Sequence, residues 1–291
     1  MKSTKIFFCI GIMSSIFLLS GCKQDPVTSV VSSDGVNIKF TNKGSGAPTL
    51  VFIHGWSNQR QIWDDQVSHF AQKYSAIAID LPGSGDSGNN RSEWTIEAFG
   101  NDVASVINTS GINEVVLVGF SMGASVVIEA ANILQDKVIG VVLVDGMKDP
   151  DTKLPPEALV VIDSVFFDLV NDMTNEKLVR LGFYKKNQEA AFKRLYPMYD
   201  GVSHVGWKES LIGAFNWGNE KRIESLQHLK VPIIAINSDK EPTNIAAFEK
   251  YVPSFEAKIM TDVGHLIFWD NPEEFNRLLE ESIQNFLIMK N

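Results

Sequence analysis

The sequence predicts an α/β fold in which helices cover both faces of a mostly parallel sheet. Several short runs of apolar, β-forming residues are continuous rather than alternating, which is typical of strands buried on both faces. Segments with helical spacing lie between these runs, and regular alternation of strand and helix favours a parallel sheet. The chain has 291 residues, 44% of them hydrophobic and 21% charged. This length and composition provide for a sizeable core and exclude disordered, collagen-like and coiled-coil proteins.

The first element along the chain is a predicted signal peptide at residues 1–21. Lys2 and Lys5 precede an apolar run from Ile6 to Leu19, which is too short for an ordinary membrane-spanning helix. We expect this segment to be removed.

The apolar run ends in Leu19-Ser20-Gly21-Cys22, which resembles the lipobox of bacterial lipoproteins. The resemblance implies acylation of the Cys22 thiol and an anchor in the membranes of a bacterial envelope, in the outer membrane if the cell has one. The alternative is ordinary secretion with Cys22 left as a free thiol. Polar and apolar residues are mixed without a regular period in residues 22–33, which are interpreted as a tether between the lipid and the folded domain.

Residues 34–291 are interpreted as one α/β domain that carries a helical insertion. An alternating edge strand is predicted at residues 36–40, continuous strands at 50–53, 76–80, 115–119, 138–144 and 233–236, and a short strand at 257–260. Helices are predicted at residues 60–73, 95–108, 122–134 and 272–287. Residues 146–230 show helical spacing without a convincing strand, which predicts a helical cap over one end of the sheet.

The strongest chemical motif is Gly119-Phe120-Ser121-Met122-Gly123, which lies between a predicted strand and a predicted helix. Glycine is needed on both sides because the turn is so sharp that a β-carbon would collide with the neighbouring element. The turn leaves Ser121 exposed at the edge of the sheet, where it is the candidate nucleophile. Met122 begins the helix, so its backbone N–H can stabilise a developing negative charge.

A second motif, His54-Gly55-Trp56, follows the strand at residues 50–53. Loops of this kind supply the other donor of an oxyanion hole through the residue after the glycine, which is Trp56 here. We expect the His54 side chain to support the loop rather than to contact a substrate.

A histidine has to accept the serine proton and return it to the leaving group. Of the five histidines, only His265 lies in a glycine-supported loop late in the chain, between a short strand and the last helix. His265 is therefore the candidate base, and the other four are interpreted as surface or packing residues.

The third member of such a site is an acid that orients the imidazole ring. Asp239 follows the strand at residues 233–236 and gives the chain order serine, acid, histidine, so it is the first choice. Two alternatives remain: Glu241 in the same loop, and Asp145 at the end of the preceding strand.

Charge and composition bear on possible partners. With 26 Lys plus Arg against 35 Asp plus Glu, the net charge is −9, which disfavours binding to nucleic acid. Gly83-Ser-Gly85-Asp-Ser-Gly88 fits the dinucleotide pattern G-x-G-x-x-G, but it leads into polar Asn89 and Asn90 rather than into a helix. We expect no cofactor and no metal, and the sequence leaves the oligomeric state open.

Together these motifs resemble the α/β-hydrolases with a helical cap. The loop from Asp80 to Ser87 is similar to a signature loop of that family, and the resemblance extends over about residues 36–288. It implies an eight-stranded, mostly parallel sheet, a Ser121–Asp239–His265 triad and an acyl-enzyme route. One departure concerns the acid: its strand commonly ends in glycine with the aspartate three positions later, whereas here Asn237 takes the glycine position and Asp239 follows two later.

The function expected from these residues is that of a serine hydrolase that cleaves a carboxylic ester of a small molecule. A serine at the elbow disfavours epoxide and haloalkane chemistry, which uses a carboxylate nucleophile. Lactonase, aminopeptidase, carbon–carbon hydrolase and perhydrolase activities share the same triad and remain alternatives. A non-catalytic, envelope-tethered binding protein on this fold is a further alternative.

Overall fold

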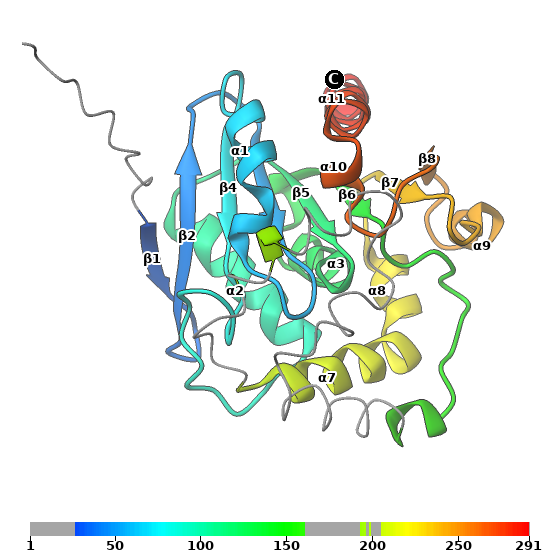
Figure 1. The fold of residues 1–291 in the computed structure, drawn as a ribbon, viewed down its shortest axis with the longest axis horizontal. Coiled ribbons are helices and arrows are strands. Elements are labelled where there is room, and N and C mark those ends of the chain that lie inside the picture. Colours follow the sequence, from blue (N-terminus) through cyan, green and yellow to red (C-terminus); the bar gives the residue numbers. More distant parts are fainter. Residues whose placement is uncertain (1–26, 161–192, 196–197, 199–204, 291) are drawn as a thin grey trace, which may run out of the picture.

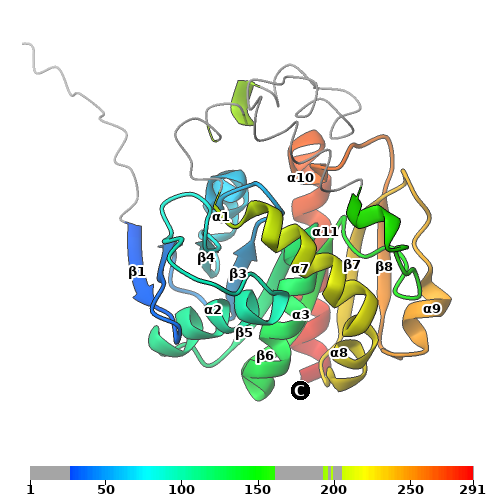
Figure 2. The ribbon, with the colours of Figure 1, turned by 90° about the horizontal axis from the view of Figure 1, so that it is seen from below.

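The computed structural model describes residues 27–160, 193–195, 198 and 205–290. An eight-stranded sheet lies at the centre, with the strand order β1-β2-β4-β3-β5-β6-β7-β8. The β1–β2 and β2–β4 pairs are antiparallel and the remaining pairs are parallel. Figure 2 shows β1 at one edge of the sheet and β8 at the other. The predicted fold class is therefore confirmed.

The strands follow the apolar runs of the sequence closely. Their bounds are β1 Val27–Val31, β2 Asn37–Lys43, β3 Thr49–Ile53, β4 Ser75–Ile79, β5 Val115–Phe120, β6 Val138–Val144, β7 Ile233–Ser238 and β8 Glu256–Met260. Every residue of the central strands β3, β5 and β6 is buried. This burial is the reason that their sequences do not alternate between polar and apolar residues.

Helices cover both faces of the sheet, and alternate strand residues divide between two core layers. In β3, Val51 and Ile53 pack in one layer with α2 (Ile96–Thr109) and α3 (Met122–Leu134), whereas Leu50 and Phe52 pack in the other with α1 (Asp64–Phe70) and α11 (Pro272–Lys290). Figure 1 shows α11 on one side of the strands and α3 on the other. The other helices are η1 Arg60–Trp63, η2 Gln135–Lys137, α7 Trp207–Glu220, α8 Arg222–His228, α9 Ile245–Glu249 and α10 Ile267–Asp270.

The N-terminal segment differs in part from the expected tether. Val27–Val31, which contains three valines and a threonine, forms strand β1 and pairs with β2, as its β-branched residues favour. The signal peptide and the acylated Cys22 lie outside the described residues and stay predictions. Within the part of the chain that is described from residue 27 onward, no helix is long and apolar enough to cross a membrane.

The insertion expected at residues 146–230 is described at its two ends. Helices α7 and α8 form its C-terminal part, and no strand occurs in the part of the insertion that the structure describes. Residues 161–192, 196–197 and 199–204 of the insertion lie outside the described residues.

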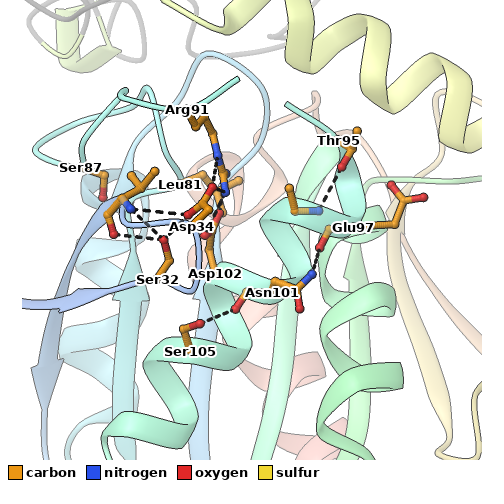
Figure 3. Close-up of polar contacts among 12 residues, drawn as sticks. Ser32, Asp34, Leu81, Ser87, Arg91, Thr95, Glu97, Asn101, Asp102 and Ser105 are labelled. Atoms are coloured by element: carbon orange, nitrogen blue, oxygen red, sulfur yellow. Dashed lines mark hydrogen bonds and ion pairs between the residues drawn. The ribbon is translucent and has the colours of Figure 1, made fainter. Parts of the chain in front are cut away.

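A buried arginine fastens the turn between β1 and β2 to helix α2. The guanidinium of Arg91 donates to Asp102 Oδ2 at 2.7 Å and to Asp34 Oδ2 at 2.5 Å, and the Arg91 and Asp102 side chains are 3% and 1% exposed. Figure 3 shows Arg91 between the two carboxylates. Burial raises the pKa of Asp102 to about 6, although the hydrogen bonds and charge of Arg91 oppose the increase. Arg91 therefore allows a carboxylate to lie inside the protein.

Replacing this cation tests the inference. Arg91→Met leaves Asp102 buried and unpaired, so we expect the free energy of unfolding at pH 7 to fall by about 3–5 kcal/mol. A carboxyl with a raised pKa takes up a proton on mild acidification, so the loss is expected to shrink as the pH falls from 7 towards 5. Urea unfolding followed by circular dichroism measures both values. The Arg91→Met/Asp102→Asn double variant should recover part of the loss, and no recovery would contradict the account.

Candidate active site

Ser121 lies at a sharp turn between β5 and α3. Its φ of 53° and ψ of −116° place a non-glycine residue in a sparsely populated region of backbone space. The backbone is held there by two hydrogen bonds: Ser121 N–H donates to Val144 O at 3.0 Å, and Ser121 O accepts from Ala124 N at 3.0 Å. A β-carbon at Gly119 would lie 2.2 Å from Gly123 O. The strand–turn–helix elbow expected from the sequence is present.

His265 approaches this turn from the other end of the chain. Its ring packs on Phe120, the residue before the serine, with a centroid distance of 4.6 Å. Asp270 Oδ2 accepts a hydrogen bond from Gly264 N–H at 2.6 Å and so fixes the loop that carries the histidine. His265 Nδ1 lies 2.6 Å from Asp145 Oδ2. His265 thus has a carboxylate partner, as the base of a triad requires.

The partner of His265 is Asp145, and this corrects the choice of Asp239. Strand β6 lies between β5 and β7 in the sheet, so the residue after β6 is one strand nearer to the serine than the residue after β7. Gly146 confirms the closeness, because a β-carbon there would lie 3.2 Å from Ser121 Cα.

The candidate acids after β7 are exposed and make no hydrogen bond to His265 among the described contacts. Asp239 is exposed, and its N–H donates to Met260 O at the end of β8, at 3.0 Å. Glu241 is also exposed, although it lines the same cavity as His265. Asp145 was the alternative at the end of the preceding strand, and it occupies the place that the sequence assigned to Asp239.

The second carboxylate oxygen of Asp145, Oδ1, has three polar contacts among the described residues. Oδ1 accepts from the N–H of Ser238 at 2.8 Å and from its hydroxyl at 2.7 Å, and Lys148 Nζ lies 3.1 Å away. Burial tends to raise the pKa of Asp145, but hydrogen bonds from His265 and Ser238 and the positive charge that His265 can carry outweigh burial and lower the pKa to about 2. The carboxylate is therefore charged at neutral pH and fixed in one orientation.

Lys148 adds a positive charge to this group. Its ammonium donates to Ser238 Oγ at 2.9 Å and to Ser238 O at 3.1 Å, besides its ion pair with Asp145. Its side chain is 13% exposed. Neither Lys148 nor Ser238 belongs to a recognisable sequence motif. A signal for Ser238 is its polar character at the last position of a buried strand.

The loop of the predicted oxyanion hole packs directly against the elbow. A β-carbon at Gly55 would lie 3.1 Å from Ser121 Cβ. His54 is buried and accepts from Leu81 N–H at 3.0 Å through Nε2, while its Nδ1 donates to Gly55 O at 2.7 Å. Burial lowers the pKa of His54 to about 4, so the ring is neutral. His54 supports the loop, as expected, and Trp56 and Met122 lie on the two segments that meet at Ser121.

The Trp56 side chain connects this loop to the cap. Its Nε1 donates to Trp207 O, the first residue of α7, at 2.8 Å. Trp207 in turn donates from its own Nε1 to Gly83 O at 3.0 Å. These bonds connect the oxyanion loop, the cap and the glycine-rich loop, and no pattern in the sequence predicts them.

The glycine-rich loop itself closes around an aspartate rather than around an open space for phosphates. Asp80 is buried and accepts hydrogen bonds from the N–H groups of Arg60 at 2.7 Å and Asp86 at 3.0 Å. Its carboxylate also pairs with the Arg60 guanidinium. A β-carbon at Gly85 would lie 2.3 Å from Asp80 Oδ2, so this glycine lets the loop close on the carboxylate.

A cavity of about 830 Å³ opens at the carboxyl end of the central strands. Ser121, Asp145 and His265 all line it, together with residues of the cap and of the loop after β7. Such a concave space beside a nucleophile can hold a small substrate. Among the described residues, no group of three or more His, Cys, Asp and Glu side chains is arranged to hold a metal ion.

Comparison with known proteins agrees with the α/β fold. Residues 50–278 match the model of the alpha/beta hydrolase family. The chain is 25% identical to the dihydrolipoyllysine-residue acetyltransferase component of the acetoin cleaving system of Cupriavidus necator, over 86% of this chain and 67% of that protein. It is 23% identical to the pimeloyl-[acyl-carrier protein] methyl ester esterase of Wigglesworthia glossinidia brevipalpis, over 84% of this chain and 96% of that protein.

A solved structure shows the same fold. A thermophilic esterase from Thermogutta terrifontis superimposes with a TM-score of 0.77 at 21% identity, over 90% of this chain and 99% of the esterase. The family match covers most of the sheet and the segment from the elbow to the His265 loop. The chain belongs to the alpha/beta hydrolase family.

Proposed function

We propose that this hydrolase cleaves carboxylic esters through a Ser121–His265–Asp145 triad. The observation that carries the proposal is the 2.6 Å contact between His265 Nδ1 and Asp145 Oδ2 beside a cavity that Ser121 also lines. Asp145 fixes the tautomer that carries hydrogen on Nδ1, so Nε2 is the nitrogen that exchanges a proton with the serine. The esterases among the similar proteins support ester hydrolysis as the reaction.

The reaction proceeds in two halves. His265 removes the proton of the Ser121 hydroxyl, and Oγ attacks the ester carbonyl carbon to form a tetrahedral oxyanion. The backbone N–H groups of Trp56 and Met122 are the proposed donors to this oxyanion. His265 then protonates the departing alcohol, and a water molecule attacks the acyl-enzyme in the same way to release the acid and regenerate the serine.

A substrate panel tests this function. The purified full-length chain is assayed with 4-nitrophenyl esters of increasing acyl length, with lactones and with aminoacyl amides. We expect turnover of at least one ester, with a burst of nitrophenol that reports the acyl-enzyme where deacylation is slower than acylation. Hydrolysis of amides or lactones but of no ester would contradict the esterase assignment and show that the same triad catalyses another reaction. If no substrate is turned over, the site is a binding site and the proposal fails.

Lys148 provides a test of how the acid is positioned. Its ammonium lies 3.1 Å from Asp145 Oδ1 and donates to Ser238 Oγ, which in turn donates to the same oxygen. In Lys148→Met the ion pair and this hydrogen bond are lost, so kcat is expected to fall by about 10-fold while KM stays within about twofold of the wild type. Lys148→Arg keeps the charge and should retain most of the rate. An unchanged kcat in Lys148→Met would show that Lys148 does not position the acid.

A further inference from the structure

Among the described residues that line the cavity beside the triad, Arg222 is a cation whose hydrogen-bonding groups are not all satisfied. Arg222 begins helix α8 and lines the cavity along with Ser121 and His265. Its guanidinium donates from one terminal nitrogen to Thr152 O, and its Nε is buried without a hydrogen-bond partner. A half-buried guanidinium with unmet donors is costly, so a ligand that accepts hydrogen bonds from its terminal nitrogens is favoured.

The neighbouring carboxylates are turned towards other partners. Asp151 accepts from Lys250 Nζ at 2.7 Å and from the Tyr251 hydroxyl at 2.6 Å, and Asp149 Oδ2 accepts from Asn244 at 3.1 Å. No described carboxylate lies within ion-pairing distance of Arg222. Burial lowers the pKa of Arg222, while the charges of Asp149 and Asp151 oppose the change, but a guanidinium stays protonated in proteins. Arg222 is thus a positive charge on the cavity wall without a direct counter-ion among the described residues.

There is open space beside this charge. Gly218, in the last turn of the preceding helix α7, also lines the cavity, and a β-carbon built on it would meet only the second terminal nitrogen of Arg222, at 3.9 Å. Two of the described lysines also line the cavity: Lys148 already holds Asp145 and Ser238, and Lys240 is an exposed residue of the loop after β7. The unfilled place for an anion is therefore next to Arg222 and Gly218.

We propose that Arg222 binds a carboxylate of the substrate, at a distance from the ester that is cleaved. This inference rests on the proposed esterase function and narrows it to esters that carry a second, ionised carboxyl group, such as monoesters of dicarboxylic acids. A carboxylate fits a guanidinium because two of its N–H donors can meet two oxygens. Asp149 and Glu241 also line the cavity and repel the same group, so Arg222 is the group needed to hold it there.

Matched pairs of substrates test the charge preference. In the acyl arm, 4-nitrophenyl hydrogen glutarate is compared with 4-nitrophenyl pentanoate; in the alcohol arm, 4-carboxyphenyl butyrate is compared with phenyl butyrate. For the wild type we expect kcat/KM to favour the charged ester by about 10- to 100-fold in one of the arms. The arm that shows the preference identifies the side of the ester on which the carboxylate lies.

Variants then assign the preference to the arginine. Arg222→Gln should remove the preference and leave the neutral esters within about twofold of the wild type, and Arg222→Lys should retain part of it. Gly218→Leu fills the space beside the guanidinium and should lower the rate for the charged ester more than for the neutral one, with Gly218→Ala as the matched control. A charge preference that persists in Arg222→Gln, or its absence in both arms of the wild type, would overturn the inference.

A binding measurement keeps this inference separate from the esterase function. Glutarate is titrated calorimetrically into the wild type, Ser121→Ala and Arg222→Gln. We expect equal binding to the first two and at least tenfold weaker binding to the third. If glutarate binds in this pattern but no ester is turned over, the esterase proposal is refuted and the carboxylate site is supported. Equal binding to all three would refute the carboxylate site alone.

Discussion

Asp145→Asn is expected to lower kcat for a turned-over ester by about four orders of magnitude. An amide in place of the carboxylate no longer stabilises the imidazolium and can donate to Nδ1, which favours the wrong tautomer of His265. Because Oδ1 of Asp145 is held by Ser238 and Lys148, the side chain keeps its position and the loss is one of chemistry rather than of folding. Initial rates with a 4-nitrophenyl ester at saturating concentration measure the effect.

Asp239→Asn is the matched control for this experiment. Asp239 carries the same functional group at the end of the next strand, but its side chain is exposed and Asp145 holds the histidine. We expect its kcat to stay within about twofold of the wild type, since exposed substitutions away from the site change little. Loss of activity in Asp239→Asn with retention in Asp145→Asn would reverse the assignment of the acid.

Ser121→Ala has the largest expected effect, a fall in kcat of about 10⁶-fold, since no other group can form the acyl-enzyme. Stability should change by less than about 1 kcal/mol, because the hydrogen bonds that hold the elbow come from the backbone of residue 121 and not from its hydroxyl. Stopped-flow and long-term assays with the same ester quantify the loss. Circular dichroism is used to check that Ser121→Ala folds.

Ser125→Ala serves as the control for the nucleophile. Ser125 lies one turn further along α3 and lines the same cavity, so it is a second serine hydroxyl in the same environment. Its removal is expected to change kcat by less than threefold. If Ser125→Ala were inactive and Ser121→Ala retained its rate, the nucleophile would have been assigned to the wrong turn of the helix.

Most of the sheet could be predicted from local sequence. The continuous apolar runs at 50–53, 115–119 and 138–144 have no polar face, and the strands β3, β5 and β6 are buried on both sides. The elbow was predictable for a related reason: the two glycines around Ser121 leave room for a turn that other residues would block. The edge strand β1 was harder to predict, because Val27–Val31 becomes a strand only by pairing with β2.

The acid could not be fixed from local sequence because strand order is a property of the tertiary structure. Asp145 and Asp239 each follow a buried strand, and both fit the order of the triad along the chain. Only the placement of β6 between β5 and β7 brings the first of them to His265. The departure at Asn237 from the pattern of the family was the one local sign that the strand β7 does not carry the acid.

The residues that surround the triad could not be predicted from sequence patterns either. Lys148 and Arg222 lie in a segment whose sequence shows helical spacing and no motif, and their roles follow from what they contact across 90 and 70 residues of chain. The hydrogen bond between Trp207 and Trp56 likewise joins residues that are 151 positions apart in the chain. Long-range contacts of this kind depend on how the cap folds back over the sheet.

Reaction with a fluorophosphonate tests the central claim most directly, since it requires an activated serine but not the natural substrate. The purified protein is incubated with the reagent, and the modified residue is located by peptide mass spectrometry. The account predicts one adduct, on Ser121, formed at least 100-fold more slowly in His265→Ala. The absence of an adduct, an adduct on another residue, or an unchanged rate in His265→Ala would contradict the claim that His265 activates Ser121.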